Sequence, residues 1–222
     1  MRGAIVLAGG PSRRLGRPKA LVPVHGVPLI LRVVTAAREV VEEVVVVDRP
    51  RHDSEIEWIL PPGVVSVRDA RRLQTPLVGL LAGGAALRSP YALALGCDQP
   101  FLAPPLLAAL FAQVGNHDAA VPRWPNGMIE PLVAVYRKAA MVRAADGALA
   151  AGERSNQEML DRIRDVHFVA TDELRRFDPH LRSFVNVNTP ADLERAKRMK
   201  GSSPVSVPAN RVTRSDARRR RR

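Results

Sequence analysis

The chain has 222 residues, of which 46% are hydrophobic and 4% aromatic, and its formal net charge is +12. This length supports one sizeable core and is short for two, so we expect a single domain. A single cysteine, Cys97, excludes an internal disulfide and favours a reducing, cytoplasmic location. No apolar run approaches the ~18 residues of a membrane span, so we expect a soluble protein that is not exported.

Half of the net positive charge lies in the last segment. Residues 201–222 hold seven arginines and one acid, Asp216, in a composition that cannot bury a core. We therefore predict a folded domain over residues 1–200 and a disordered basic tail over residues 201–222. The net charge of +12 makes a nucleic-acid-binding protein the non-enzyme alternative. The sequence does not support it, because its basic residues are not interleaved with aromatic residues.

The folded part begins with a strand that leads into a basic loop. The apolar run Ala4–Ala8 predicts a buried strand, and Gly9-Gly10-Pro11 ends it. Free backbone N–H groups and several cations, with no acid among them, favour binding of phosphate in the loop. The polar residues of this loop are Ser12, Arg13, Arg14, Arg17 and Lys19.

Predicted strands and helices alternate along the rest of the chain. This alternation indicates an α/β fold with a doubly wound, mostly parallel sheet, helices on both faces and a site at the carboxyl edge of the strands. The expected strands are 44–47, 64–67, 91–96, 119–121, 132–136 and 166–170. The expected helices run from Pro28 to about Glu43, from Pro76 to about Leu87, from near Pro104, from about Lys138 to Ala151, in a short segment after Ser155, and from Pro190 to about Lys200.

Candidate site residues follow the ends of these strands. Asp98 follows a buried strand and can hold a metal ion there, or it can cap the helix that starts near Pro104. In 184–190, alternation puts Asn186 and Asn188 on one face of a predicted strand. The segment 123–130 has a turn at Asn126-Gly127 and a Trp124 that looks exposed, so it forms either a plain hairpin or part of a pocket.

Several of these segments resemble one family. Leu7 to Lys19 have the pattern L-A-G-G-x-S-x-R-L-G-x-x-K, which resembles the signature of nucleotidyltransferases that activate sugars, polyols and pterins. The LAGG form most resembles the molybdenum cofactor guanylyltransferase family. Residues 19–29, 96–101 and 184–190 are similar to its K-x-L-x-x-x-x-G-x-P-L, G-C-D-x-P-[FY] and F-V-N-V-N-T-P motifs. The resemblance extends over about residues 3–197.

The resemblance implies a Rossmann-like nucleotidyltransferase that moves GMP from GTP to the phosphate of molybdopterin and releases pyrophosphate. It implies Mg²⁺ as cofactor, a molybdopterin-type acceptor, and molybdoenzyme maturation proteins as candidate partners. Sister enzymes remain alternatives, in which CTP or GTP reacts with a molybdopterin cytidylyl acceptor, methylerythritol phosphate or cobinamide phosphate.

The resemblance also implies residue roles. Asp98 would hold the metal ion and contact the nucleotide, and Arg14 and Lys19 would balance phosphate charge. The other implied nucleotide contacts are Leu7, Ala8, Gly9, Gly10, Asp48 and Asp69. The implied acceptor or metal contacts are Asn186, Asn188, Trp124 and Glu130.

Overall fold

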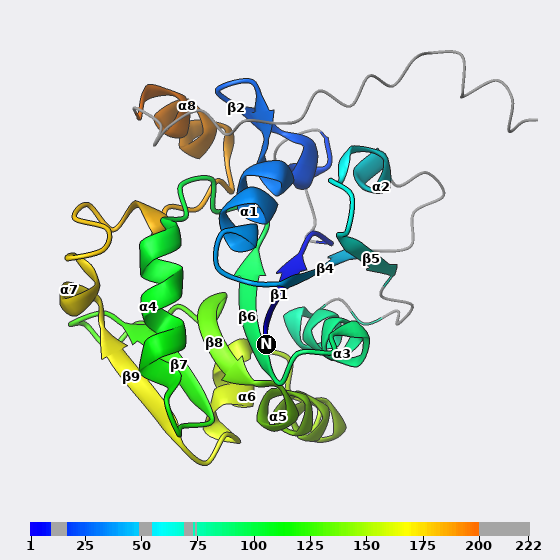
Figure 1. Cartoon of the computed structure of the whole chain (residues 1–222), viewed down its shortest axis with the longest axis vertical. Helices are drawn as coiled ribbons and strands as arrows, with labels where there is room; N and C mark the ends of the chain where they lie inside the picture. Colours follow the sequence, from blue (N-terminus) through cyan, green and yellow to red (C-terminus); the bar gives the residue numbers. More distant parts are fainter. Residues whose placement is uncertain (10–16, 49–54, 69–72, 74, 200–222) are drawn as a thin grey trace, which may run out of the picture.

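The computed structural model describes residues 1–9, 17–48, 55–68, 73 and 75–199. Within these residues, one sheet contains seven strands in the order β5-β4-β1-β6-β8-β7-β9 (Figure 1). Strand β8 is antiparallel to β6 and β7, and the remaining pairs are parallel. The predicted mostly parallel sheet is thus confirmed. The strands are β1 (Arg2–Leu7), β4 (Glu43–Asp48), β5 (Val65–Arg68), β6 (Tyr91–Gly96), β7 (Ala119–Arg123), β8 (Val133–Arg137) and β9 (Val166–Ala170).

Helices cover both faces of this sheet, as the prediction of a doubly wound fold requires. Successive residues of a strand point to opposite faces, so Ala4 and Val6 of β1 share a core with α1 and α4, while Ile5 shares one with α3, α5 and α6. Figure 1 shows α3, α5 and α6 grouped on one side. The helices are α1 (Leu29–Arg38), α2 (Glu55–Ile59), α3 (Pro76–Ala86), α4 (Pro104–Val114), α5 (Lys138–Ala150), α6 (Asn156–Asp161), α7 (Thr171–Leu174) and α8 (Pro190–Arg198).

The first long helix is shorter than its sequence pattern suggests. It was expected to reach about Glu43, but α1 ends at Arg38 and Glu43 is the first residue of β4. The buried carboxylate of Glu43 accepts hydrogen bonds from the backbone N–H groups of Arg88 and Ser89, each at 3.0 Å. The hydrogen bond from Arg88 joins residues 45 positions apart. The neighbouring sequence therefore could not show that Glu43 belongs to a strand and not to the helix.

The predicted strand at 184–188 is also wrong. Phe184 ends a 3₁₀ helix, η2 (Arg182–Phe184), and residues 185–188 have no regular secondary structure. The backbone N–H of Val187 donates to the carbonyl oxygen of Asp98 (2.9 Å), which lies beyond the end of β6. A strand requires a series of hydrogen bonds to a neighbouring strand, but this segment bonds to the loop after β6.

Side-chain caps stand at the starts of α3, α6 and α8. Thr75 caps α3 by accepting from Leu77 N–H (3.0 Å), and Ser155 and Thr189 each form a capping box at the start of α6 and α8. The short helices α2 and α7 were not predicted. No described helix is long and apolar enough to span a membrane, and the predicted tail, 201–222, lies outside the described residues.

Candidate active site

The carboxyl ends of three neighbouring parallel strands form the floor of the candidate site. Leu7 at the end of β1 is in register with Val47 of β4 and Gly96 of β6. Two backbone hydrogen bonds extend this alignment past the sheet, from Ala8 N–H to Val47 oxygen (2.8 Å) and from Cys97 N–H to Leu7 oxygen (3.1 Å). The segments after β1, β4 and β6 therefore start from one edge, as ligand sites in such folds do.

Asp98 is held close to the end of β6. A side chain at Gly96 would have no room, because a Cβ there would lie 2.5 Å from Asp98 Oδ1. Glycine thus permits the carboxylate to fold back over the strand end. The helix-capping alternative for Asp98 is wrong, since α4 begins after Ala103 and has no side-chain cap.

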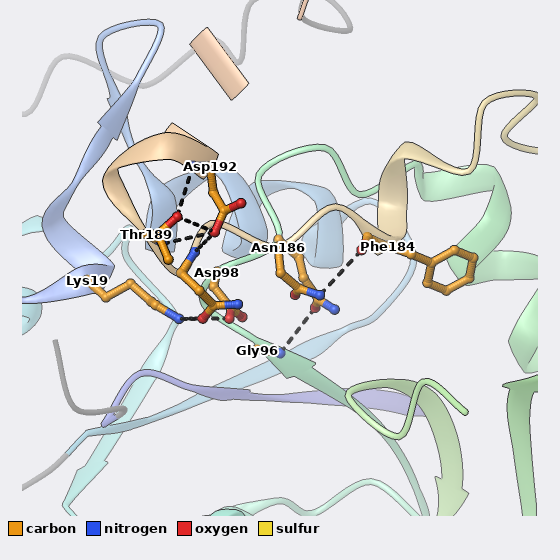
Figure 2. A network of polar contacts seen from close by, with 9 residues as sticks. Lys19, Gly96, Asp98, Phe184, Asn186, Thr189 and Asp192 are labelled. Atoms are coloured by element: carbon orange, nitrogen blue, oxygen red, sulfur yellow. Dashed lines mark hydrogen bonds and ion pairs between the residues drawn. The ribbon is translucent and has the colours of Figure 1, made fainter. Parts of the chain in front are cut away.

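Lys19 and Asp98 point toward each other at this edge (Figure 2), and Asn188 contacts the same lysine. Lys19 Nζ donates to Asp98 Oδ2 at 2.9 Å and also to Asn188 Oδ1. The Lys19 and Asp98 side chains are 14% and 21% exposed, so the pair is largely shielded from bulk water. The 3₁₀ helix η1 (Lys19–Leu21) positions the lysine, and the short hairpin of β2 (Pro23–Val24) and β3 (Val27–Pro28) follows it.

The two asparagines have different environments although alternation placed them together. Asn188 contacts Lys19, whereas Asn186 Nδ2 donates to the carbonyl oxygen of Phe184 in its own segment (3.3 Å). Asp192 Oδ2 accepts from the backbone N–H groups of Asn188 (3.1 Å) and Thr189 (2.9 Å), which orders the turn that presents Asn188. Sequence reasoning missed Asp192, but the capping-box spacing from Thr189 could have identified it.

The segment 123–130 is a hairpin whose two acceptor candidates contact each other. Trp124 Nε1 donates to Glu130 Oε1 at 2.8 Å, and Gly127 makes the turn with a φ of 87°. Trp124 is half-buried, not exposed as expected, because its ring packs edge-on against Phe184 with the centroids 5.5 Å apart. It also lines a cavity of about 380 Å³ with Arg123 and Phe168.

Electrostatic effects connect the hairpin and the strand ends to Asp98. Burial raises the pKa of Glu130; the hydrogen bond from Trp124 opposes this effect, and the negative charge of Asp98 adds to it. Burial likewise raises the pKa of the Cys97 thiol to about 12, with contributions from Asp98 and Asp48. Cys97 is buried and is therefore a packed thiol rather than a nucleophile.

Some of the remaining predicted nucleotide contacts lie within the described residues, and others do not. Leu7 ends β1 at the site edge, Ala8 and Gly9 follow it, and Asp48 is 8% exposed at the end of β4. Three of the predicted site residues lie outside the described residues, namely Gly10, Arg14 and Asp69.

Comparison with known proteins identifies the family. Residues 4–166 match the MobA-like NTP transferase domain. The chain belongs to the MobA-like NTP transferase family. It is therefore an enzyme, a nucleotidyltransferase, and the prediction from its motifs is confirmed.

MobA-like relatives match over nearly the whole folded part. A protein of Methanosarcina mazei, named probable molybdenum cofactor guanylyltransferase, is 37% identical over 203 residues, covering 87% of this chain and 88% of the relative. Molybdopterin-guanine dinucleotide biosynthesis protein A from Archaeoglobus fulgidus is 28% identical, with a TM-score of 0.75 and coverage of 88% and 96% of the two chains. A Thermus thermophilus structure, 2-C-methyl-D-erythritol 4-phosphate cytidylyltransferase, shares the fold, with a TM-score of 0.66 at 20% identity over 89% of this chain and 98% of that one.

The oxygen atoms at the site of this MobA-like enzyme suit a hard cation. The carboxylate of Asp98 and the amide oxygen of Asn188 already converge on one positive charge, the ammonium of Lys19. Among the described residues, no group of three or more His, Cys, Asp or Glu side chains could hold a metal ion. Mg²⁺ commonly uses one or two carboxylates and takes its other ligands from water and substrate phosphates. The residues present thus fit an ion that binds together with a nucleotide.

Proposed function

We propose that the chain transfers GMP from GTP to the phosphate of a molybdopterin-type acceptor in the cytoplasm, with Mg²⁺ as cofactor and pyrophosphate as the second product. One observation carries the proposal, namely the convergence of Lys19, Asp98 and Asn188 at the carboxyl edge of the sheet. Family membership supports nucleotidyl transfer, and the names of the relatives favour guanylyl transfer to the molybdenum cofactor.

The proposed reaction needs no protein nucleophile. An oxygen of the acceptor phosphate forms a bond to the α-phosphorus of GTP, and the bond from that phosphorus to the bridging oxygen of the β-phosphate breaks. Pyrophosphate leaves with the electron pair of that bond. The protein therefore contributes alignment of the two phosphates and neutralisation of negative charge as it develops.

Lys19 is the described cation best placed for this neutralisation. Its ammonium is bound by a carboxylate and an amide oxygen, so a phosphate that enters the site offers it a stronger anionic partner. Arg14 of the basic loop would add a second positive charge, and the backbone N–H groups of Gly9 and Gly10 would donate to phosphate oxygens. Asp98 would hold Mg²⁺, with Asn188 or Asn186 nearby, and this ion would supply further charge neutralisation at the phosphates.

Base recognition is proposed for an aspartate. A carboxylate can accept hydrogen bonds from N1–H and N2–H₂ of guanine together, which adenine cannot reproduce. Asp48 and Asp69 are the candidates, and the burial of Asp48 at the end of β4 favours a role in a desolvated pocket.

The acceptor is proposed to bind beside the 123–130 hairpin. Glu130 lies close enough to Asp98 for the charge of Asp98 to raise its pKa, and its partner Trp124 forms a wall of the 380 Å³ cavity. This volume is in the range of small-molecule sites, and the indole offers a flat apolar surface for a heterocycle.

The proposal is tested by incubating the enzyme with Mg²⁺, molybdopterin and one nucleoside triphosphate at a time while measuring pyrophosphate release. GTP should be preferred over ATP by about 10² or more, because an unpaired buried acceptor is costly. Asp98→Asn is the inactive control. Equal turnover of GTP and CTP would contradict the guanine assignment, and release with methylerythritol phosphate or cobinamide phosphate in place of molybdopterin would indicate a sister enzyme.

A further inference from the structure

A small apolar cluster joins the three segments that carry the polar residues of the site. Val22 and Val24 follow Lys19, Phe101 follows Asp98, and Val187 lies between the two asparagines. The cluster is separate from the two cores on the faces of the sheet, and its buried members are Val22, Val24, Leu29, Phe101, Val187 and Ala196. The relative positions of Lys19, Asp98 and Asn188 therefore depend on how these segments pack.

Arg32 of α1 connects two of these segments with polar contacts. Its Nε donates to the carbonyl oxygen of Val24 (3.0 Å), and its Nη1 donates to the carbonyl oxygen of Pro100 (3.4 Å). Val24 lies five residues after Lys19, and Pro100 lies two residues after Asp98. One guanidinium thus bridges the two segments whose side chains form the Lys19–Asp98 ion pair.

The position of Arg32 is unfavourable for a charge. The residue is 6% exposed, and burial lowers the pKa of its guanidinium. Within the described part of the chain it forms no ion pair with a carboxylate. A buried charge of this kind costs free energy that an apolar side chain of similar size would avoid, so stability alone does not account for an arginine here. The rigid planar fork of arginine does account for it, because the fork can reach two separate carbonyl groups.

We infer that Arg32 is a positioning residue that sets the placement of Lys19 relative to Asp98 by tying the β2 segment to the loop after β6. The path from Arg32 to the lysine is short and hydrogen-bonded. Val22 N–H donates to Lys19 oxygen (3.0 Å), and Leu29 N–H of α1 donates to Val22 oxygen (3.0 Å). On the other side, the carbonyl oxygen of Asp98 accepts from Val187 N–H. The inference rests on the proposed function only for its effect on turnover.

The test compares Arg32→Met, which removes both donors, with Arg32→Lys, which keeps the charge but not the fork. Lys138→Met is the matched control, because Lys138 Nζ also donates to a carbonyl oxygen, that of Leu87 (2.7 Å), but at the opposite end of β6. The first readout is steady-state kinetics with GTP, and the second is amide hydrogen exchange in the absence of nucleotide.

Arg32→Met should lower kcat at least about tenfold with a smaller change in KM, because misplaced charges act mainly on the transition state. Arg32→Lys should fall between this variant and wild type, since one ammonium cannot hold both carbonyls. Exchange at the Val187 and Leu29 amides should be faster in Arg32→Met, while exchange at Ala8 and Cys97, bonded within the sheet edge, stays as in wild type. Lys138→Met should change neither kcat nor these amides.

Three results would overturn the inference: a kcat for Arg32→Met within twofold of wild type, unchanged exchange at Val187 and Leu29, or equal losses in Arg32→Met and Lys138→Met. If Arg32→Lys had the same kcat as wild type, the need for simultaneous hydrogen bonds to the carbonyl groups of Val24 and Pro100 would be refuted. If wild type itself transfers no nucleotide, the proposed function fails, and hydrogen exchange still decides the role of Arg32.

Discussion

The ammonium of Lys19 lies 2.9 Å from the carboxylate of Asp98, although 79 positions separate the two residues in the chain. Asn188, 169 positions from Lys19, supplies a third polar group to the same point. Lys19 lies in the segment that follows β1, and Asp98 lies in the segment that follows β6. These two strands are adjacent in the sheet. In the free protein this ion pair keeps two oppositely charged groups in place at the edge where the phosphates are proposed to bind.

Asp98→Asn should nearly abolish turnover. The amide keeps the size of the side chain but removes the charge proposed to hold Mg²⁺, so kcat should fall by about two orders of magnitude. The free energy of unfolding should fall by only about 1 kcal/mol, because the substitution removes one partly exposed ion pair, the one between Asp98 and Lys19. Kinetics at saturating Mg²⁺ and urea denaturation measure the two effects, and near-normal turnover would contradict the mechanism.

Lys19→Met should separate binding from catalysis. The substitution removes the ammonium proposed to neutralise phosphate charge, so kcat should decrease by about 10² or more. Lys19→Arg keeps a positive charge and should retain more activity than the methionine variant. A methionine variant that lost only affinity for GTP, with kcat intact, would show that Lys19 binds ground state and transition state equally.

Deletion of residues 203–222 should leave the catalytic domain unchanged. The segment lacks the composition of a core, and it begins beyond α8, which ends at Arg198. The melting temperature and turnover should stay near those of the full chain, while weak binding to heparin or DNA should decrease and show less salt dependence. A clear loss of turnover would indicate instead that the arginines help to bind substrate.

Glu43→Gln should destabilise the fold without affecting catalysis. Beyond its two backbone bonds, the carboxylate of Glu43 accepts from Ser89 Oγ (2.9 Å). The substitution replaces a charged acceptor of these hydrogen bonds with a neutral amide, which should lower the free energy of unfolding by about 1–3 kcal/mol. Glu57→Gln, which removes an exposed partner of Arg68 (3.4 Å), is the control and should change little.

The contribution of Glu43 should depend on pH. Burial alone would raise the pKa of this carboxyl, but hydrogen bonds from Arg88 and Ser89 outweigh burial and lower it. A lowered pKa in the folded state means that the stabilisation is complete above the unfolded pKa, about 4.3, and is lost as the pH falls through the folded value. The difference between wild type and Glu43→Gln should thus be largest near neutral pH and shrink in acid. A constant difference across this range would contradict the assignment.

Much of this protein follows from short stretches of sequence. A short apolar run such as Ala4–Ala8, ended by glycines, is typical of a strand buried on both faces of a sheet. Residues such as Thr75 and Ser155 begin helices because their side chains bond to nearby N–H groups. These interactions join residues a few positions apart, so a local pattern is enough to predict them. The L-A-G-G, G-C-D and N-V-N-T-P stretches likewise indicated the family and most of the candidate site.

Other features were decided only by contacts between distant segments. The sequence pattern predicted a helix that reaches Glu43, but the carboxylate of that residue accepts hydrogen bonds from Arg88 and Ser89, which lie between α3 and β6. Alternation made Asn186 and Asn188 equivalent, but only Asn188 contacts Lys19 in the described structure, because the segment meets the Asp98 loop and not a strand. A hydrogen-bond partner far along the chain leaves no mark on the local pattern, so packing alone could assign these residues their partners.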